Sequence, residues 1–228
     1  MRLLQEPQAD ETLDALDRAV VEAVRARLAA GPRDRFDAGV LALRELMADV
    51  GPVERAALKA LWGRIEAATG PALVTSGGLA QTLATDRYGL GARPLSADEA
   101  LKAAGGGSRA LLDLSPDRPW WARLLARPEL RIVAALPDDG WARPQAFLVS
   151  REISGPTGGD RSFWVTDSGW SDAKIIDALG EAGLVADSLA AAGGLKLFVL
   201  AGYVQAEDGR LSNAPGRLTG VIGAAPIF

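Results

Sequence analysis

The chain has 228 residues, of which 48% are hydrophobic and 24% charged, and its formal net charge is -4. These proportions are those of an ordinary globular protein, and the acidic balance argues against a nucleic-acid surface, which usually carries a basic stripe. The sequence contains no histidine and no cysteine, which excludes imidazole bases, thiolate nucleophiles and metal cages built from those residues. Chemistry that needs only a pre-shaped, positively charged pocket survives these exclusions.

No targeting or membrane segment is expected. Residues 1–4 lead directly into the acidic stretch 6–14, without an apolar run behind a basic start. No apolar run approaches the roughly 20 residues that a membrane span needs. We therefore expect a cytoplasmic protein without metal, cofactor, nucleic-acid or membrane partners.

Up to residue 70, mostly apolar side chains recur at spacings of three and four residues, which is the spacing of one face of a helix. The first stripe consists of Leu13, Leu16, Val20, Ala23 and Arg27. The second stripe consists of Phe36, Val40, Leu43 and Met47. The third stripe consists of Leu58, Leu61, Trp62, Ile65 and Thr69. Gly-Pro pairs separate the stripes, so the pattern predicts three helices with short connections.

Between residues 71 and 153 short apolar runs alternate with helical segments. Strands are predicted over residues 71–75, 110–114, 130–136 and 145–153. One helix is predicted after residues 76–78 and ends at about Ala84. Two further helices are predicted over residues 97–104, where Ser96 is the cap, and over residues 120–126. This alternation is typical of an α/β layer with a mostly parallel sheet.

The last segment, residues 154–228, predicts a small α+β module. It begins with a strand over residues 162–166 and a helix over residues 172–184 behind the cap Ser171. Strands over residues 195–204 and 220–228 follow, joined by a turn-rich link.

Two polar residues lie on the apolar stripes of the predicted helices. Arg27 needs a partner there, or it must reach solvent from the helix end beside Arg25. The Thr69 hydroxyl could contact a ligand or donate to a carbonyl one turn earlier. For each residue, the sequence leaves both a ligand contact and a local contact open.

Residues Ser76, Gly77 and Gly78 stand between a predicted strand and a predicted helix. A helix N-terminus at such a turn can bind an anion, although a plain βα turn explains the same residues. No Walker motif or dinucleotide-binding fingerprint is present in the sequence.

Several segments resemble parts of one known architecture. Residues 13–17 and 25–27 resemble the first helix of the all-helical chorismate mutases, and residues 51–52 and 61–69 resemble the third. The closing segments 202–204 and 221–226 are similar to the last strands of an ACT module. The resemblance implies a multidomain α+β protein. Its three units would be a three-helix chorismate mutase-like domain over residues 1–70, a small α/β prephenate dehydratase-like remnant over 71–153, and an ACT-like α+β domain over 154–228.

The activity implied by this resemblance is the rearrangement of chorismate to prephenate in aromatic amino acid biosynthesis. The reaction compresses a dicarboxylate substrate and places positive charge beside the breaking ether bond. In the family's pattern Arg27 matches a carboxylate-binding arginine, Thr69 a small hydroxyl residue and Asp37 an acid that orients the substrate hydroxyl. The family's intertwined homodimer is also expected, because helices this short cannot wrap a substrate alone.

The sequence departs from the family's pattern at two cations. Asp10 stands at the position of the family's early arginine. The family's first-helix lysine has no counterpart, because the first lysine of this chain is Lys59. Arg33 or Arg35 is a candidate to bind substrate in place of the lysine, and Arg2 to replace the arginine. Each missing donor typically costs on the order of 3–4 kcal/mol of barrier lowering.

Two functions therefore compete, beside the third option of a protein-interaction module that has neither site. The first is a chorismate mutase without dehydratase activity, because Asp160 and Ser162 flank Arg161 where the dehydratase signature has threonine and phenylalanine. The second is a catalytically inactive protein that binds an aromatic-pathway metabolite or a partner protein as a regulator. The two missing cations motivate the second hypothesis.

Overall fold

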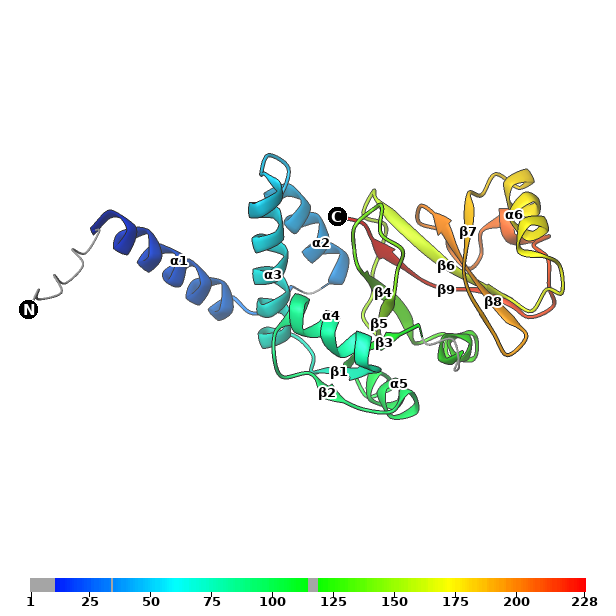
Figure 1. Cartoon of the computed structure of the whole chain (residues 1–228), viewed down its shortest axis with the longest axis horizontal. Helices are drawn as coiled ribbons and strands as arrows, with labels where there is room; N and C mark the ends of the chain where they lie inside the picture. The colour runs from blue at the N-terminus through cyan, green and yellow to red at the C-terminus, as the bar shows by residue number, and fades with distance from the viewer. Residues whose placement is uncertain (1–10, 34, 115–118) are drawn as a thin grey trace, which may run out of the picture.

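The computed structural model describes residues 11–33, 35–114 and 119–228 (Figure 1). Its helices are α1 (Glu11–Ala29), α2 (Phe36–Leu46), α3 (Pro52–Thr69), α4 (Gly78–Tyr88), α5 (Ala97–Gly105), η1 (Trp120–Ala126), α6 (Asp172–Glu181) and η2 (Gly209–Leu211). Its strands are β1 (Leu73–Ser76), β2 (Arg93–Pro94), β3 (Arg109–Asp113), β4 (Arg131–Leu136), β5 (Ala146–Ser150), β6 (Asp160–Thr166), β7 (Ala186–Ala192), β8 (Leu195–Ala201) and β9 (Thr219–Pro226).

The strands form one curled, mixed sheet of nine strands in the order β2-β1-β3-β5-β4-β9-β6-β8-β7 (Figure 1). Parallel pairing joins β1 to β2 and β3, and joins β4 to β9. The remaining neighbours are antiparallel. The prediction of a mostly parallel sheet is therefore wrong, since β5 runs antiparallel to both β3 and β4.

The sheet has two halves, which consist of β2, β1, β3, β5 and β4 on one side and of β9, β6, β8 and β7 on the other. These halves meet at Gly223. Ile132 and Gly223 form the register pair that joins β4 to β9. Gly223 has φ of 144°, and a Cβ atom there would overlap the backbone nitrogen and oxygen of Ile132. A residue with a side chain therefore cannot occupy this position without moving the strands apart.

Both faces of the sheet are covered at its centre, so β4, β5 and β6 are almost entirely buried. On β6, Phe163 and Val165 join the core beneath α5 and η1, whereas Trp164 joins the core beneath α6. On the other half, α2 and α4 pack over β3, β4 and β5. The alternation along one strand thus assigns its side chains to two separate cores.

Helix α2 is fixed to the end of the sheet by Arg44. The Arg44 guanidinium donates to the Ile227 carbonyl at 2.6 Å and to the Thr157 hydroxyl at 2.8 Å. It also donates to the carbonyls of Thr157 and Gly159. One cation therefore holds α2 against two segments that lie more than a hundred residues further along the chain.

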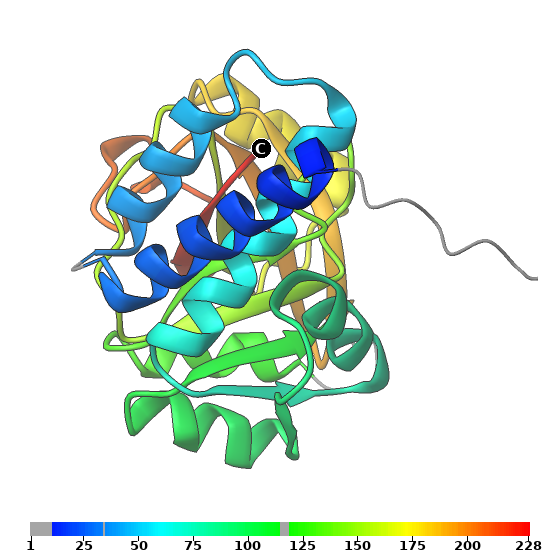
Figure 2. The ribbon, with the colours of Figure 1, turned by 90° about the vertical axis from the view of Figure 1, so that its left-hand side faces the viewer.

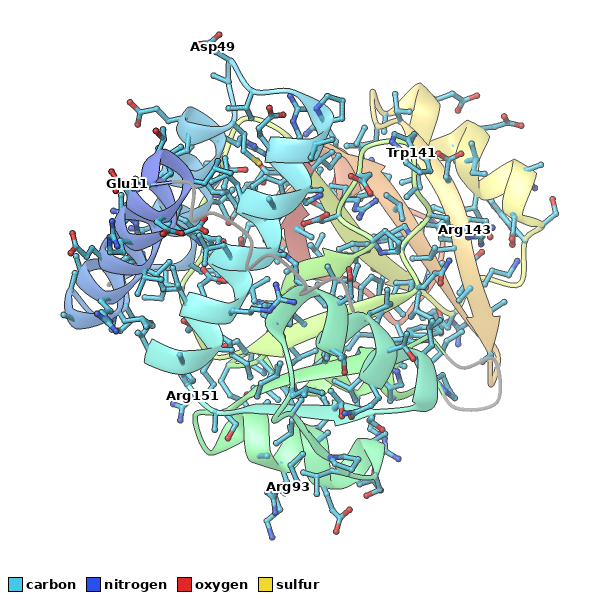
Figure 3. All side chains as sticks on the ribbon, turned by 60° about the vertical axis from the view of Figure 1, so that its left-hand side comes forward. Glu11, Asp49, Arg93, Trp141, Arg143 and Arg151 are labelled. Atoms are coloured by element: carbon cyan, nitrogen blue, oxygen red, sulfur yellow. The ribbon has the colours of Figure 1, made fainter. Side chains whose placement is uncertain are left out.

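Helix α1 does not join a helical bundle. None of its residues is buried, and it projects from the body beyond α3 (Figure 1). Viewed from that side, α1 lies obliquely in front of α2 and α3 (Figure 2). Figure 3 shows the side chains of α1 surrounding the helix, with Glu11 in its first turn. The same view shows Arg143 beside β7, where it donates to the Ser188 carbonyl at 3.0 Å.

The predicted three-helix unit is consequently wrong, and so is the multidomain α+β layout. The stripe of α2 is buried, but Phe36 and Val40 pack on the sheet rather than around a helical core. Strands from residues 71–153 and from residues 154–228 belong to the same sheet. The boundaries at residues 70 and 153 stay predictions.

Local predictions fared better than the architecture. Ser96 and Glu99 form a capping box at the start of α5, and Ser171 caps α6. The predicted helix over residues 120–126 is a 3₁₀ helix, and the strands β2 and β7 were missed. Over the described ranges 11–33, 35–114 and 119–228, no helix combines the length and apolar character that a membrane span requires.

Replacing Gly223 by alanine should separate the sheet halves and lower the free energy of unfolding by about 3 kcal/mol, because it combines a disfavoured φ with overpacking. Gly180 in α6 is a matched control, since a Cβ atom there meets nothing within 4 Å. Gly180→Ala should leave stability unchanged or raise it by up to about 1 kcal/mol. Urea denaturation followed by circular dichroism measures both, and equal stabilities would contradict the assigned role of Gly223.

Candidate functional site

Four of the predicted site residues lie around one small pocket where α1, α2 and α3 meet. Arg27, Arg33, Arg35 and Thr69 line it, together with Arg109 from β3. We call Arg27, Arg33, Arg35 and Arg109 the arginine cluster. The cavity has a volume of about 20 Å³, which is room for about one water molecule.

Trp62 on α3 lies at the centre of this cluster. The guanidinium carbons of Arg27 and Arg33 lie 5.4 Å and 5.6 Å from the Trp62 ring centroid. The ring is only 8% exposed, and its Nε1 donates to Glu66 at 3.1 Å. Two cations thus share one aromatic ring, within the distance at which cation–π attraction is significant.

Arg27 and Arg33 differ from the other two arginines in their charge partners. Among the described residues, neither takes part in an ion pair. Arg27 donates to the Gly31 carbonyl at 2.6 Å, which closes the end of α1. The sequence left the contact of Arg27 open, and the structure gives it a ring and a carbonyl rather than a carboxylate.

Arg35 is paired with Asp37. Two hydrogen bonds of 2.9 Å and 2.6 Å join the guanidinium to the carboxylate. Asp37 also accepts from the backbone N–H of Gly155 at 2.9 Å, so it faces that loop and does not line the pocket. The hydrogen bonds from Arg35 hold the pKa of Asp37 below its usual range.

Arg109 was missed by the sequence analysis. Its side chain is 8% exposed and donates to both oxygens of Glu152 at 2.5 Å and 2.6 Å. A third nitrogen lies 3.9 Å from Glu66, and the guanidinium lies over the Phe36 ring. Burial raises the pKa of Glu152, but the hydrogen bonds and charge of Arg109 more than offset this, so the pKa is lowered.

The remaining candidates lie elsewhere. The Thr69 hydroxyl donates to the Ile65 carbonyl at 2.8 Å, which is the local alternative foreseen from the sequence. Lys59 pairs with Asp138 and Asp139, outside the cluster. Arg2 and Asp10 lie outside the described residues. The proposed catalytic roles of Arg27, Asp37 and Thr69 are not tested by these contacts and stay predictions.

The turn before α4 is occupied by a carboxylate of the chain itself. A Cβ atom on Gly77 would overlap the carboxylate of Asp113, and Asp113 accepts from the backbone N–H of Leu79. This carboxylate takes the place of an external anion at the N-terminus of α4.

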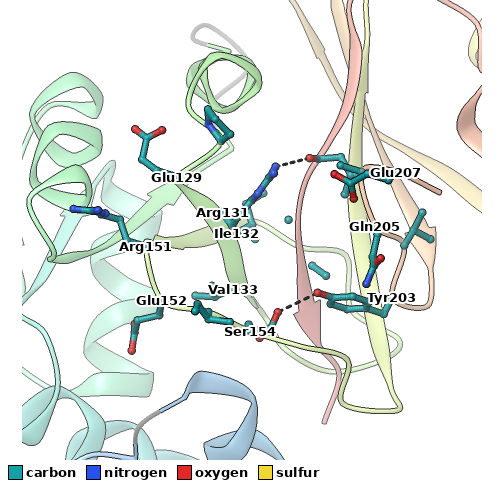
Figure 4. A pocket seen from close by; sticks show the side chains of 17 residues that line it. Glu129, Arg131, Ile132, Val133, Arg151, Glu152, Ser154, Tyr203, Gln205 and Glu207 are labelled. Carbon is teal, nitrogen blue, oxygen red and sulfur yellow. Dashed lines mark hydrogen bonds between the residues drawn. The ribbon is translucent and has the colours of Figure 1, made fainter.

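A larger cavity opens beside the joint between the sheet halves. This sheet cleft has a volume of about 460 Å³ and lies between the ends of β5 and β8 (Figure 4). The Tyr203 hydroxyl donates to the Ser154 carbonyl at 3.0 Å, and Arg131 donates to the Val221 carbonyl at 2.8 Å. Both polar side chains thus contact backbone carbonyls at the cleft walls.

Comparisons with known proteins give little similarity. No family model matches the sequence, and no curated protein matches it. One solved structure, described as GqqA, a novel type of quorum quenching acylase, aligns with a TM-score of 0.44 and 17% identity. The alignment covers 68% of this chain and 95% of that one.

The fold corrects the resemblance to an all-helical chorismate mutase with dehydratase-like and ACT-like regions. The chain forms a strand-rich, nine-stranded sheet instead of a helical mutase unit followed by separate modules. The pieces that carried the resemblance are local patterns, and such patterns occur in unrelated folds.

The Arg109–Glu152 pair predicts a pH-dependent stability. Because the folded-state pKa of Glu152 is lowered from 4.5, its contribution is fully present above that pH and is lost as the pH falls through the folded-state value. Glu152→Gln should cost about 3 kcal/mol at neutral pH, since it removes the closer charge partner of a buried cation and leaves only Glu66 at 3.9 Å. The difference from the unchanged protein should shrink below pH 4.5.

Chemical denaturation at several pH values measures this difference. Glu45→Gln on the exposed side of α2 is the control and should change little. A cost for Glu152→Gln that stays constant down to pH 3, well below the ordinary range for glutamate, would contradict the ion-pair account.

Proposed function

We propose that this protein binds a small organic carboxylate through Arg27 and Arg33, beside the ring of Trp62. The observation that supports the proposal is the unequal pairing within the arginine cluster. Arg35 and Arg109 each have a carboxylate partner, whereas Arg27 and Arg33 have none among the described residues. A guanidinium is suited to hold a carboxylate through two parallel hydrogen bonds.

The local charge favours an anion at this position. Two guanidiniums stacked on one buried ring repel each other, and an anion between them would offset that repulsion. The chain as a whole has a net charge of -4, so the surplus of positive charge is local. Trp62 keeps the guanidiniums in place before the ligand arrives, which reduces the ordering cost of binding.

The volume of the pocket limits what can enter it. About 20 Å³ has room for about one carboxylate oxygen, which is similar in size to a water molecule, so the rest of the ligand would lie outside the cavity. Arg33 is exposed, so the rest of the molecule would extend over the surface near the connection between α1 and α2. We therefore propose small mono- or dicarboxylates as the ligand class.

The contacts support binding rather than proton transfer. The Thr69 hydroxyl is engaged by Ile65, and Glu66 accepts from Trp62. Glu152 is held by Arg109 with a lowered pKa. A role as a metabolite-binding regulator follows from the hypothesis drawn from the sequence, and the cytoplasmic location stays a prediction.

Isothermal titration with the monocarboxylates acetate and benzoate and the dicarboxylate succinate tests the proposal. At least one should bind, and its affinity should fall as salt is added, because exposed charges are screened. Arg27→Gln and Arg33→Gln should each weaken binding about tenfold or more, which corresponds to the loss of a charged hydrogen bond.

Two control variants separate this site from other positive charge. Arg25→Gln removes an exposed arginine from the same helix, and Tyr203→Phe alters the sheet cleft. Both should bind as the unchanged protein does. The proposal fails if no carboxylate binds at about 10 mM, where even weak complexes form, or if Arg25→Gln weakens binding as much as Arg27→Gln.

A further inference from the structure

Helix α1 presents an uncovered apolar stripe. It is 19 residues long, and none of them is buried. Leu16 and Val20 are 59% and 60% exposed, and Val21 and Leu28 are 47% and 37% exposed. The spacing of four residues between Leu16 and Val20 places these two side chains on one side of the helix, and the spacing of seven between Val21 and Leu28 places those two beside each other at the edge of that side.

A projecting helix of this kind, which we call the arm, is not stable alone in water. Helices of this length gain most of their stability from packing of the apolar side, and an isolated one is marginal. The contact of α1 with the body lies near its C-terminal end, where Arg27 stacks on Trp62. The stripe ahead of that contact therefore requires a partner.

The charges of α1 identify which partner fits. Its first half carries the acidic residues Glu11, Asp14 and Asp17, and its last turns carry Arg25 and Arg27. A second α1 laid antiparallel would place acidic halves against basic ends and would align the helix dipoles favourably. A parallel copy would place like charges together.

We propose that α1 docks against α1 of a second copy of this chain, antiparallel, with the apolar stripes facing each other. Such an interface is isologous, because each arm offers the other the same surface, and it closes after two chains. The inference does not rest on carboxylate binding, since Leu16 and Val20 do not line the pocket of the arginine cluster.

The oligomeric state of the full chain tests the interface. Sedimentation equilibrium should show a dimer, and the double variant Leu16→Gln with Val20→Gln should shift it to monomer by raising the dissociation constant at least a hundredfold, on the order of an alanine-scan hot-spot pair. The matched control is Arg18→Gln with Glu22→Gln, which changes two residues on the opposite side without changing net charge. This control should remain a dimer.

Thermal unfolding of the body distinguishes loss of the interface from misfolding. Because α1 contributes no buried residue, the body of the Leu16→Gln, Val20→Gln variant should unfold at a temperature similar to that of the control. A monomeric unchanged protein would overturn the proposal, as would a double variant that dimerises as tightly as the control.

The absence of cysteine from the chain allows the orientation to be tested by disulfide cross-linking. In an antiparallel pair centred near Val20, Val20→Cys should cross-link two chains under mild oxidation. Leu28→Cys should not, because its partner position would lie about 24 Å away along the helix axis. Equal cross-linking at both positions would indicate a parallel pair and contradict the proposed orientation.

These experiments can succeed or fail independently of the proposed function. A dimer that binds no carboxylate would refute only the ligand proposal. A monomer whose carboxylate affinity depends on Arg33 would refute only the interface.

Discussion

The close approach of Gly223 to Ile132 is the contact on which the single sheet depends. The strands β4 and β9 are joined through this pair, and a side chain at residue 223 would overlap the backbone of Ile132. The same contact borders the sheet cleft. Ile132 and Gly223 both line this cavity of about 460 Å³.

The sheet in turn determines where the arginine cluster lies. Antiparallel pairing of β3 with β5 sets Ala110 opposite Val149, so Arg109 and Glu152 come together although they are 43 residues apart. Their ion pair sits beneath Phe36 of α2. Since α2 is also fixed by Arg44, the helix that follows Arg33 is positioned by contacts with the sheet rather than by contacts with α1.

The parts of the fold that could be predicted from the sequence are those encoded within a few residues. Ser96 and Ser171 cap helices because their side chains reach backbone N–H groups three residues away. The Thr69 hydroxyl also makes a local contact, because it donates to the Ile65 carbonyl four residues earlier. By contrast, β7 was missed because ADSLAAA is rich in alanine and lacks the β-branched residues typical of strands.

Long-range features could not be read in this way. No pattern of neighbouring residues indicates that Gly223 joins the two halves of the sheet, or that Arg109 forms an ion pair with Glu152. The prediction from the family resemblance was wrong because helical stripes separated by Gly-Pro pairs specify helices but not the elements against which those helices pack. The stripe of α2 is buried by the sheet, whereas that of α1 stays exposed; periodicity is the same in both cases.

Arg27 connects the two surfaces that carry proposals. It lies on α1, yet its guanidinium stacks on Trp62 of α3, so the direction of the arm and the position of this cation are linked. A dimer that restricts α1 would restrict Arg27 as well, and a carboxylate bound to Arg27 would in turn restrict α1. Thermodynamic linkage makes such an effect reciprocal. Arg33 offers the contrast, because it lies outside α1 and contacts the same ring, so its hold on a carboxylate depends on the body of the protein alone.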